Sequence, residues 1–452
     1  MQGASAAIDE IVVTSKRQPE AVVEHIGNIA KLGEEAVRQS QHVHSHELFV
    51  RVPGVWIVRA SGQESLPSIR SPVLTGPGSC GAFLILENGI PTRPNGFCNV
   101  NQMFELPTEL AAGIEVIRGP GNALYGSNAL HGTINVLLPG ADTVPQAAVE
   151  FGPNDFLRLS GQFGTSGGTS AGIVYADDGG FRDDSGYRQT KGFASHSLDT
   201  GSGSLTFNLA ASDLDQETAG FILGFDAYKD PVLRTQNLNP EAFRQASSQR
   251  LTAHWQRPGR RFDLDVRPFL RHSDMEFLQH FLPGQPLEEN GHVSAGVLTS
   301  LSWESGAFAT VAGFDLEWAD VFLKQTQFGE TEGSDFLRET RPEGKHYDYE
   351  VEGVTAAAFV QTEFAVSERL ALNAGLRAEH VRYDYDNRML DGNTRDYVTP
   401  CGFGGCLYTR PADRCDTFNN VAPKLGGLLR LGGDTVAYVN AARGFRSPQM
   451  TE

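Results

Sequence analysis

The sequence has few sulfur-containing residues, no long apolar segment and no excess of basic residues. Its 452 residues include 5 methionines and 5 cysteines, and its mean hydropathy is -0.28. No apolar run approaches the roughly 20 residues that a transmembrane helix requires, so a helical membrane protein is excluded. The formal net charge of -18 argues against a nucleic-acid partner, because nucleic-acid phosphates require a basic face. A β-barrel is compatible with this composition, since its hydrophobicity is hidden in alternation.

Glycine is abundant, with 50 residues, and the segment from Ile114 to Pro139 is rich in it. Its glycines permit positive φ angles and close backbone approach, so a phosphate-binding loop is one interpretation. However, the segment lacks the GxxxxGK[ST] spacing, and no unit of strand, glycine loop and helix with a downstream acidic residue surrounds it. Tight turns in a small α/β cap are the better interpretation.

After Pro145 the sequence alternates between apolar and polar residues. Apolar side chains occupy alternate positions at Leu157, Leu159 and Phe163, at Leu205, Phe207, Leu209 and Ala211, at Phe262, Leu264 and Val266, and at Leu370, Leu372, Ala374 and Leu376. A period of two residues predicts β-strands. A soluble sandwich or propeller would show the same pattern, so alternation alone does not identify the fold.

The connections between the predicted strands differ strongly in length. Short glycine-rich turns are expected at residues 165–170, 200–204, 257–261, 304–307 and 431–434, and long polar connections at 177–191, 212–249, 271–292, 322–350 and 384–419. This order places the short turns on one rim and the long loops on the other, as in membrane β-barrels. Loops of this length are rare in compact soluble domains unless they are functional. The sequence therefore favours a membrane barrel over a soluble sandwich or propeller.

The number of predicted strands is about thirteen, whereas single-chain bacterial barrels have even numbers and plugged transporters have about 22. The barrel is therefore not expected to close within this chain. We expect the sequence to be a fragment of a longer protein.

Three elements of the glycine-rich segment follow one another in a specific order: IEVIRGP at Ile114–Pro120, YGS at Tyr125–Ser127 and HGTIN at His131–Asn135. This order resembles the end of the plug domain of TonB-dependent outer-membrane receptors. The final ARGFRSP, Ala442–Pro448, resembles a mid-barrel strand of that family. The resemblance implies a small α/β plug domain inside a transmembrane antiparallel β-barrel, with about 22 strands in the family and about 13 here. It assigns residues 1–20 to an N-terminal segment, 21–140 to the plug and 146–452 to a partial barrel.

The N-terminal sequence IDEIVVT resembles a TonB box, the short extended segment that binds TonB. It comprises Ile8, Asp9, Glu10, Ile11, Val12, Val13 and Thr14. Binding is expected by β-augmentation, in which the main chain pairs with the sheet edge of a partner. The alternative is an N-terminal strand that packs in the plug, since terminal strands are often tied into sheets.

The resemblance also implies a latch between plug and barrel. Plug arginines of such receptors pair with barrel-wall glutamates, and these roles fall to Arg70 and Arg118 in the plug and to Glu317 and Glu363 in the barrel. Both glutamates share a strand face with other polar residues, so we expect them to point into the wet lumen. The alternative is solvated lumen charge without a partner, because exposed ion pairs contribute little.

The plug hairpin FLILENGIP, Phe83–Pro91, resembles a strand and turn of the family, and its Asn88-Gly89 pair favours a type I′ turn. Cys80 and Cys98 flank the hairpin, so we expect them to form a disulfide in an oxidising compartment. Three more cysteines lie in one long predicted loop, and their pairing stays open. They are Cys401, Cys406 and Cys415.

The segment RPNGFCNVNQ after this hairpin is the candidate ligand-binding segment. Its Arg93, Asn95, Phe97 and Asn99 suit an anionic or polar aromatic ligand, such as a catecholate or hydroxamate chelate. The alternative is a polar loop satisfied by its own backbone, because Asn and Gly favour turns. The acidic net charge also warns against assuming an anion, although local fields can differ from the net charge.

Three histidines alternate with other residues at His42, His44 and His46. They share one face only if the stretch is a strand throughout, which a metal or haem site on them would need. A short helix resembling that of the family is expected within Glu47–Gly54, with Ser45 as its N-cap. We therefore expect no metal site and no cofactor.

The resemblance implies a receptor for active uptake of a scarce ligand, by default a ferric siderophore. The expected partners are TonB with its inner-membrane energising complex, outer-membrane lipid and a small-molecule ligand. Met1–Ala7 has neither a charged n-region nor an apolar h-region, so bacterial outer-membrane localisation requires a signal peptide not present in this sequence. The alternatives are a receptor for haem, cobalamin or another nutrient, a signalling or adhesion barrel, and a barrel hydrolase. No catalysis is expected, because the sequence has no nucleophile elbow.

Overall fold

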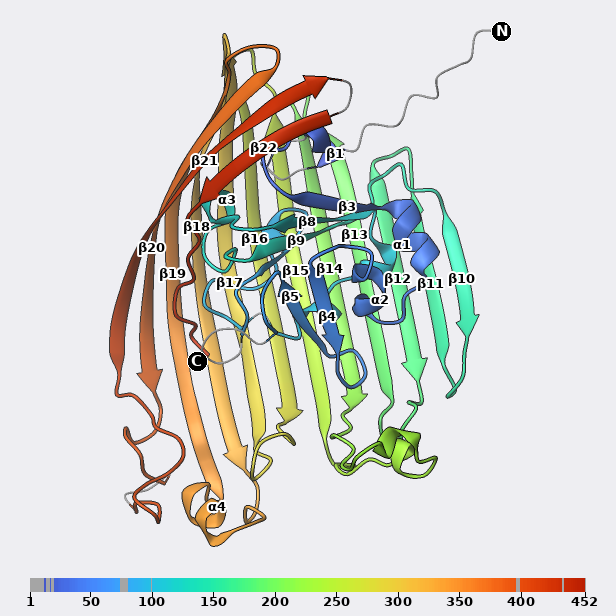
Figure 1. The fold of residues 1–452 in the computed structure, drawn as a ribbon, viewed down its shortest axis with the longest axis vertical. Coiled ribbons are helices and arrows are strands. Elements are labelled where there is room, and N and C mark those ends of the chain that lie inside the picture. The colour runs from blue at the N-terminus through green and yellow to red at the C-terminus, as the bar shows by residue number, and fades with distance from the viewer. Residues whose placement is uncertain are drawn as a thin grey trace.

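The structure is a computed structural model that describes residues 12–13, 17, 20–73, 80–98, 100–395, 399–432 and 435–451. A tall curved sheet wraps around a small α/β domain, the plug, which lies on the concave side of the sheet (Figure 1). Within the described residues the sheet is open, with β10 and β22 as its two edges. No helix in this part of the chain has the length and hydropathy needed to cross a membrane.

The large sheet contains thirteen strands in the described part of the chain, each antiparallel to the next in sequence order. They are β10 Gln146–Phe151, β11 Leu157–Gly164, β12 Thr169–Asp178, β13 Tyr187–Asp199, β14 Ser204–Glu217, β15 Phe243–Arg257, β16 Asp263–Leu278, β17 Leu287–Ser305, β18 Phe308–Gln327, β19 Gly344–Ala365, β20 Leu370–Asn387, β21 Arg414–Gly432 and β22 Thr435–Ala442. The predicted number of strands and the predicted open sheet are confirmed.

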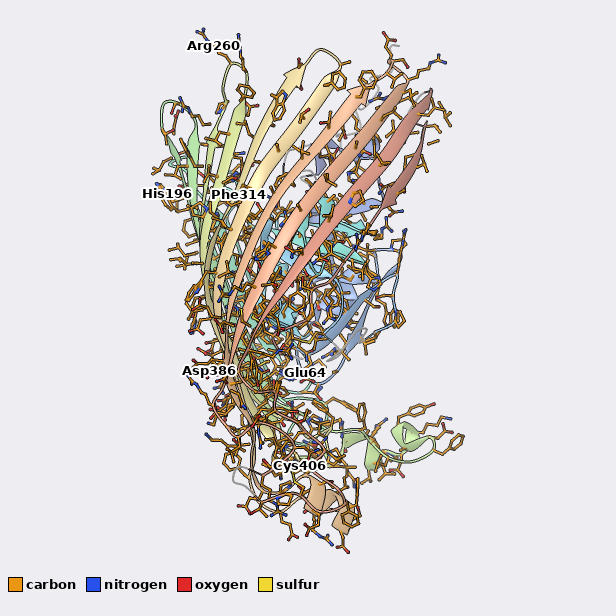
Figure 2. All side chains as sticks on the ribbon, turned by 90° about the vertical axis from the view of Figure 1, so that its left-hand side faces the viewer. Glu64, His196, Arg260, Phe314, Asp386 and Cys406 are labelled. Carbon is orange, nitrogen blue, oxygen red and sulfur yellow. A yellow bond between two sulfur atoms is a disulfide. The ribbon has the colours of Figure 1, made fainter. Side chains whose placement is uncertain are left out.

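The two rims of the sheet differ as the connection lengths predicted. Arg260 lies in a short turn at one end and Cys406 in a long loop at the other (Figure 2). The strands extend further into the predicted long loops than expected; for example, β16 ends at Leu278 and β17 begins at Leu287. The reason is that ladder hydrogen bonds need no apolar side chains, so strands continue where both faces are polar and alternation disappears.

The two faces of the large sheet have the reverse of the polarity found in a soluble protein. In β14 the apolar side chains of Phe207 and Leu209 are exposed on the outer face, whereas Asn208, Ser212 and Gln216 are buried on the inner face. The other strands also carry exposed large apolar residues. An apolar outside and a polar inside are typical of a membrane barrel. Burial therefore decides the question that alternation left open.

The plug contains a five-stranded sheet in the order β3, β8, β9, β6, β7. These strands are β3 Ile29–Gly33, β8 Gly113–Arg118, β9 Gly132–Leu137, β6 Leu84–Glu87 and β7 Ile90–Pro91, and only the β6–β9 pair is parallel. The β6–β7 turn has positive φ at Asn88 (49°) and Gly89 (79°), as a type I′ turn requires. Asn88 Oδ1 also accepts a hydrogen bond from Leu138 N, which ties the turn to the end of β9.

The remaining plug elements cover this sheet and connect it to the N-terminus. They are β1 Val12–Val13, β2 Glu20–Ala21, η1 Val22–Glu24, α1 Glu34–Ser40, α2 Ser45–Phe49, β4 Val55–Arg59, β5 Ser65–Ile69, η3 Gln102–Glu105, η4 Thr108–Leu110 and α3 Asn122–Tyr125. In the long loops of the barrel lie η5 Ala227–Lys229, η6 Leu233–Thr235 and α4 Asp335–Thr340. The plug core includes Leu48, Phe49, Ile57, Ile69, Phe83, Ile85, Leu106, Ile114, Val116, Ile134 and Val136.

The N-cap of α2 differs from the prediction. Ser45 is the first helical residue, and the cap is His44, whose Nδ1 accepts a hydrogen bond from His46 N. The expected helix also begins two residues earlier than Glu47. A neutral imidazole nitrogen can satisfy a free helix donor as a hydroxyl does, and the usual list of N-cap residues omits this use.

Candidate functional site

A cavity of about 1290 Å³ lies between the plug and the long-loop ends of the strands, and we call it the outer cavity. The plug lines it with residues that include Val43, Glu47, Arg59, Glu64, Leu66, Arg93, Phe97 and Asn101, and the barrel with Phe156, Phe181, Tyr187, Phe221, Arg244, Met275, Phe277, Phe281 and Glu288. Figure 2 shows Glu64 at the height of Asp386, near the loop end of β20. A concave site of this size, with an aromatic wall and a few polar groups, suits a small-molecule ligand.

The structure brings two of the four predicted ligand-binding residues, Arg93 and Phe97, to the outer cavity. Phe97 is buried and packs edge-on against His292 of β17. Asn95 lies deeper, where its backbone N–H donates to Glu317 (2.7 Å) and its side chain to Thr355 (3.2 Å). Asn99 lies outside the described residues.

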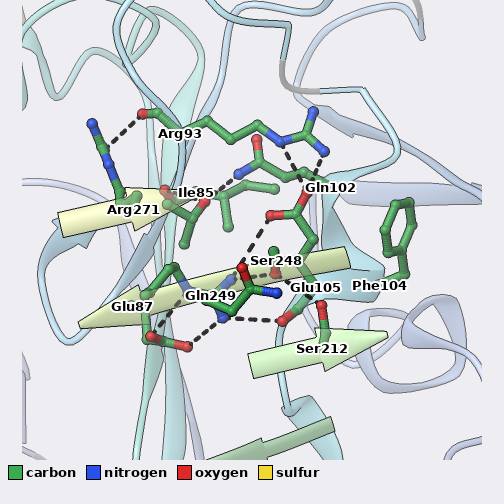
Figure 3. Close-up of polar contacts among 12 residues, drawn as sticks. Ile85, Glu87, Arg93, Gln102, Phe104, Glu105, Ser212, Ser248, Gln249 and Arg271 are labelled. Atoms are coloured by element: carbon green, nitrogen blue, oxygen red, sulfur yellow. Dashed lines mark hydrogen bonds and ion pairs between the residues drawn. The ribbon is translucent and has the colours of Figure 1, made fainter. Parts of the chain in front are cut away.

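The contact between plug and barrel is centred on buried charges. Arg250 of β15 donates to both carboxylate oxygens of Glu87 (3.2 and 3.0 Å) and to the carbonyl oxygen of Glu105 (3.0 Å). On the plug side, the Nε of Arg93 donates to the Glu105 carboxylate (3.1 Å), and Arg271 of β16 donates to the carbonyl oxygen of Arg93 (3.0 Å; Figure 3). Paired and bidentate contacts of this kind are the strong form of hydrogen bond.

The same polarity recurs along the barrel wall: the barrel supplies the cation and the plug supplies the oxygen. Other such contacts run from Arg158 to His42 O, from Lys191 to Glu109 (2.6 Å), from Arg244 to Glu64 (2.9 Å) and from Arg377 to Leu124 O (3.3 Å). Sequence reasoning missed these residues. The available signal was a basic residue in the inward register of an alternating strand, such as Arg250 next to the outward Leu251.

The expected latch is corrected by these contacts, because the structure does not pair Arg118 with Glu317. Arg118 donates to two plug carbonyls, Pro53 O (2.6 Å) and Ile29 O (3.4 Å). Burial and the neighbouring Arg70 guanidinium lower the pKa of Arg118. The Glu317 carboxylate is already neutralised by Arg271 of the barrel wall.

The two glutamates of the expected latch have different surroundings. Glu317 accepts from Arg271 of the barrel (2.7 Å) and from Asn95 N of the plug, so it does hold the plug, with another partner. Glu363 lies on β19, opposite Ala309 of β18. Arg70 is exposed and lies with Arg118 beside Gly54.

The plug–barrel arginine with the expected polarity is instead Arg17, in the N-terminal segment. Its guanidinium donates to both oxygens of Asp315 on β18 (2.7 and 2.8 Å) and to Leu124 O (2.7 Å), and it stacks over the ring of Phe359. Arg377 donates to the same Asp315 carboxylate (2.7 Å). The chain that leads from the N-terminus to the plug is therefore attached directly to the barrel wall.

The predicted TonB box lies largely outside the described residues. Ile8, Asp9, Glu10, Ile11 and Thr14 are outside them, whereas the backbone of Val12 and Val13 forms β1 and pairs with β2. This pair forms a two-stranded sheet of its own, separate from the five-stranded sheet of the plug.

The structure joins Cys80 and Cys98 in a disulfide that closes the loop carrying Arg93 and Phe97. Cys401 and Cys406 form a second disulfide in the long loop after β20. Cys415 is exposed, with a free thiol. The pairing that the sequence left open among the last three cysteines is thus the one between nearest neighbours.

Of the three histidines at residues 42–46, His44 and His46 lie together with their Nδ1 atoms 3.2 Å apart, whereas His42 has other partners. His44 Nε2 donates to Glu64 O (2.9 Å), and His42 bonds Thr108 Oγ1 (3.0 Å). Burial lowers the pKa of His42 to about 4 and that of His44 to about 3, so both rings are neutral at physiological pH. The residues that the structure describes contain no group of three or more His, Cys, Asp or Glu suited to a metal ion.

The comparisons with known proteins match this architecture along most of the chain. Residues 150–452 match the family model described as TonB dependent receptor-like, beta-barrel, and residues 22–133 match the TonB-dependent Receptor Plug Domain. The chain belongs to the TonB-dependent receptors. This family consists of β-barrels of the bacterial outer membrane, which places the receptor there and accounts for the apolar outer face of the sheet.

Individual relatives of the receptor are distant. It is 27% identical over 193 residues to the vitamin B12 transporter BtuB of Vibrio vulnificus (strain CMCP6), a match that covers 43% of this chain and 30% of that protein. It resembles the ferric yersiniabactin uptake receptor FyuA from Yersinia pestis (TM-score 0.71, 15% identity, 93% of this chain and 65% of that one). It also resembles the unliganded ferric citrate transporter FecA (TM-score 0.72, 15% identity, 95% and 64%). The chain thus spans less than two thirds of the length of these proteins.

Proposed function

We propose that the complete receptor imports a scarce ligand, by default a ferric siderophore, across the outer membrane with energy delivered through TonB. The observation that carries this proposal is the outer cavity, which lies between the plug and the long loops. A ligand bound there faces the loops on one side and the plug on the other. Movement of the plug is then required before the ligand can pass, because the plug occupies the concave side of the sheet (Figure 1).

The N-terminal segment provides the proposed route for that movement. The TonB box Ile8–Thr14 precedes Arg17, whose guanidinium holds both the barrel at Asp315 and the plug at Leu124 O. Force applied to the segment reaches this contact before it reaches the plug core. Release of Arg17 does not leave Asp315 as an unpaired buried charge, because Arg377 still donates to the same carboxylate.

The test is uptake by the complete receptor with residues 1–14 deleted. Transport of the ligand is expected to be lost, whereas ligand binding at the cell surface is expected to be retained. A deletion variant that still accumulates ligand inside the cell would contradict energy coupling through this segment. If the unaltered receptor binds ligand at the cell surface but imports none, the signalling or adhesion alternative is favoured.

We propose that Arg93, Phe97 and Asn99 contact the ligand, and of these Arg93 and Phe97 line the outer cavity. Asn95 holds their loop against Glu317. Ligand affinity of the Phe97→Ala and Asn99→Ala variants is compared with that of Asn95→Ala. Unchanged affinity in the first two variants would assign recognition to the long loops.

Cobalamin is the second candidate ligand, favoured by the similarity to a vitamin B12 transporter. Uptake of labelled cyanocobalamin and of ferric chelates by the same cells distinguishes the two. Haem is tested in the same assay.

A further inference from the structure

The charged residues that line the outer cavity balance one another. The basic ones are Arg59, Arg93, Arg182 and Arg244, and the acidic ones are Glu47, Glu64, Asp178 and Glu288. Four cations therefore face four carboxylates in the described lining. An anion bound here would gain no net attraction from the described lining, and the whole chain carries a formal charge of -18.

Two of the cations are paired with carboxylates of the cavity itself. Arg244 of β15 contacts Glu64 at 2.8 Å, and both side chains are largely buried. Arg59 faces Glu47 at 3.8 Å nearer the solvent. A ligand carboxylate or catecholate that took over Arg244 would leave the Glu64 carboxylate without its cation, which is costly in a buried site.

The other two cations are held by groups other than the carboxylates of the lining. Arg93 is buried against the Glu105 carboxylate, and its Nη1 donates to Cys98 O. Arg182 lies in the loop after β12, where its guanidinium donates to Gln236 O and Gly220 O. All four guanidinium groups thus have partners before any ligand arrives.

The charged groups of the lining have partners, whereas three of its phenylalanine side chains are exposed. Phe181, Phe221 and Phe281 expose 58%, 83% and 57% of their surface beside the cavity. Exposure of a phenylalanine forgoes about 1.5–3 kcal/mol of burial free energy. The loop that carries Phe221 is fixed at its root, because Ser61 Oγ of the plug donates to Ala219 O and accepts from Ala219 N.

We propose that the ligand of the outer cavity is electrically neutral and buries an apolar or aromatic face against Phe181, Phe221 and Phe281. This inference rests on the proposed import function and specifies its substrate class. A ferric ion held by three singly charged hydroxamates is neutral, whereas one held by three doubly charged catecholates is a trianion. The cavity therefore selects the hydroxamate type or another neutral ligand, because such a ligand leaves every arginine pair intact.

The experiment measures equilibrium binding to the complete receptor in detergent. The probes are a ferric tris-hydroxamate chelate, a ferric tris-catecholate chelate and cyanocobalamin, each at low and at physiological salt. One of the two neutral probes is expected to bind at least about tenfold more tightly than the trianion, with little salt dependence. Tighter binding of the trianion, or equal binding of all three, overturns the inference alone. Binding of none of them contradicts both the inference and the default ligand of the proposed function.

Matched variants separate the charge argument from the apolar one. Glu64→Gln leaves Arg244 without its carboxylate, so affinity for the trianion is expected to rise about fivefold or more while that for the neutral probe changes less than about twofold. Phe221→Ala is expected to weaken the neutral probe by about tenfold. Its control is Phe225→Ala in the same loop, which is 99% exposed and not part of the cavity lining. Equal effects of the two phenylalanine variants, or no gain by Glu64→Gln, would contradict the proposal.

Discussion

The plug is in contact with two kinds of buried surroundings, its own core and the inner wall of the barrel. Its core is built from apolar side chains such as Ile69, Ile85 and Ile134, each with no exposed surface. Its contact with the barrel is built from ion pairs and hydrogen bonds, and in Arg250 with Glu87 and Arg17 with Asp315 both side chains are buried. Both regions exclude solvent, and they do so with opposite chemistry.

This difference separates the stability of the plug from its attachment. Apolar burial contributes about 25 cal/mol per Å², and all of it is lost when the surfaces enter water. Polar groups that leave one another can bond to water instead, so a single interfacial hydrogen bond contributes only about 0.5–1.5 kcal/mol net. The plug can therefore move against the wall at a lower cost than it can unfold.

The largest expected effect comes from removing a wall cation while leaving its plug carboxylates in place. Arg250→Ala leaves Glu87 without its bidentate partner in a buried site, which is expected to cost about 3–5 kcal/mol of plug attachment. The measurement is the urea concentration at which the plug of the complete receptor becomes sensitive to protease. Arg257→Ala, an exposed arginine on the same strand, is the control. Equal urea midpoints for Arg250→Ala and Arg257→Ala would show that the pair of Arg250 with Glu87 does not hold the plug.

A substitution in the plug core is expected to lower the stability of the plug itself and not its attachment to the barrel. Ile85→Ala creates a cavity beneath β6 and is expected to cost about 2–5 kcal/mol. The plug should unfold in place, so core amides lose hydrogen-exchange protection while the barrel strands keep theirs. In Arg250→Ala the core amides should stay protected. Identical exchange patterns in the two variants would show that core and attachment are one cooperative unit.

Acid is expected to weaken the plug through His44. Its folded pKa of about 3 lies below the ordinary value of 6.5, because burial disfavours the charged ring. The unfolded chain then binds more protons than the folded one between these values, so stability is complete above pH 6.5 and falls as the pH is lowered. A drop of about 1.5 pH units below that value is expected to cost about 2 kcal/mol.

The control for this pH dependence is His44→Asn. Asparagine keeps an N-cap acceptor for α2 and does not titrate. Its plug should lose less stability between pH 6.5 and 5 than the unaltered plug, measured by the same protease assay. An unchanged pH profile in this variant would assign the acid sensitivity to other groups.

The smallest effect is expected where a polar contact of the plug is exposed. Glu24 pairs with Arg430 of β21 at 3.0 Å, and both side chains are about half exposed. Glu24→Gln should change plug attachment by less than about 1 kcal/mol, because water and salt screen such pairs. A loss as large as that in Arg250→Ala would show that burial does not set the strength of these contacts.

The pattern of residues was sufficient for the fold but not for the latch. The outward Phe207 and Leu209 alternate with inward polar residues, and that period of two predicted the strands because side chains of a strand alternate between its faces. The pairing of Arg118 with Glu317 failed for a different reason. Resemblance supplied the residue types, whereas the distance between two strands in space depends on register and curvature, which no local pattern contains.

The sequence by itself determined the strand number, the order of short and long connections, the plug turn at Asn88 and the family, because each depends on local spacing along the chain. Only the tertiary structure decided which carboxylate meets which cation. Arg250 reaches Glu87 across 163 residues, and Arg17 reaches Asp315 across 298. Such pairs form where the folded wall brings a desolvated charge to its counter-charge, and the energy that selects them exists only after both have been buried.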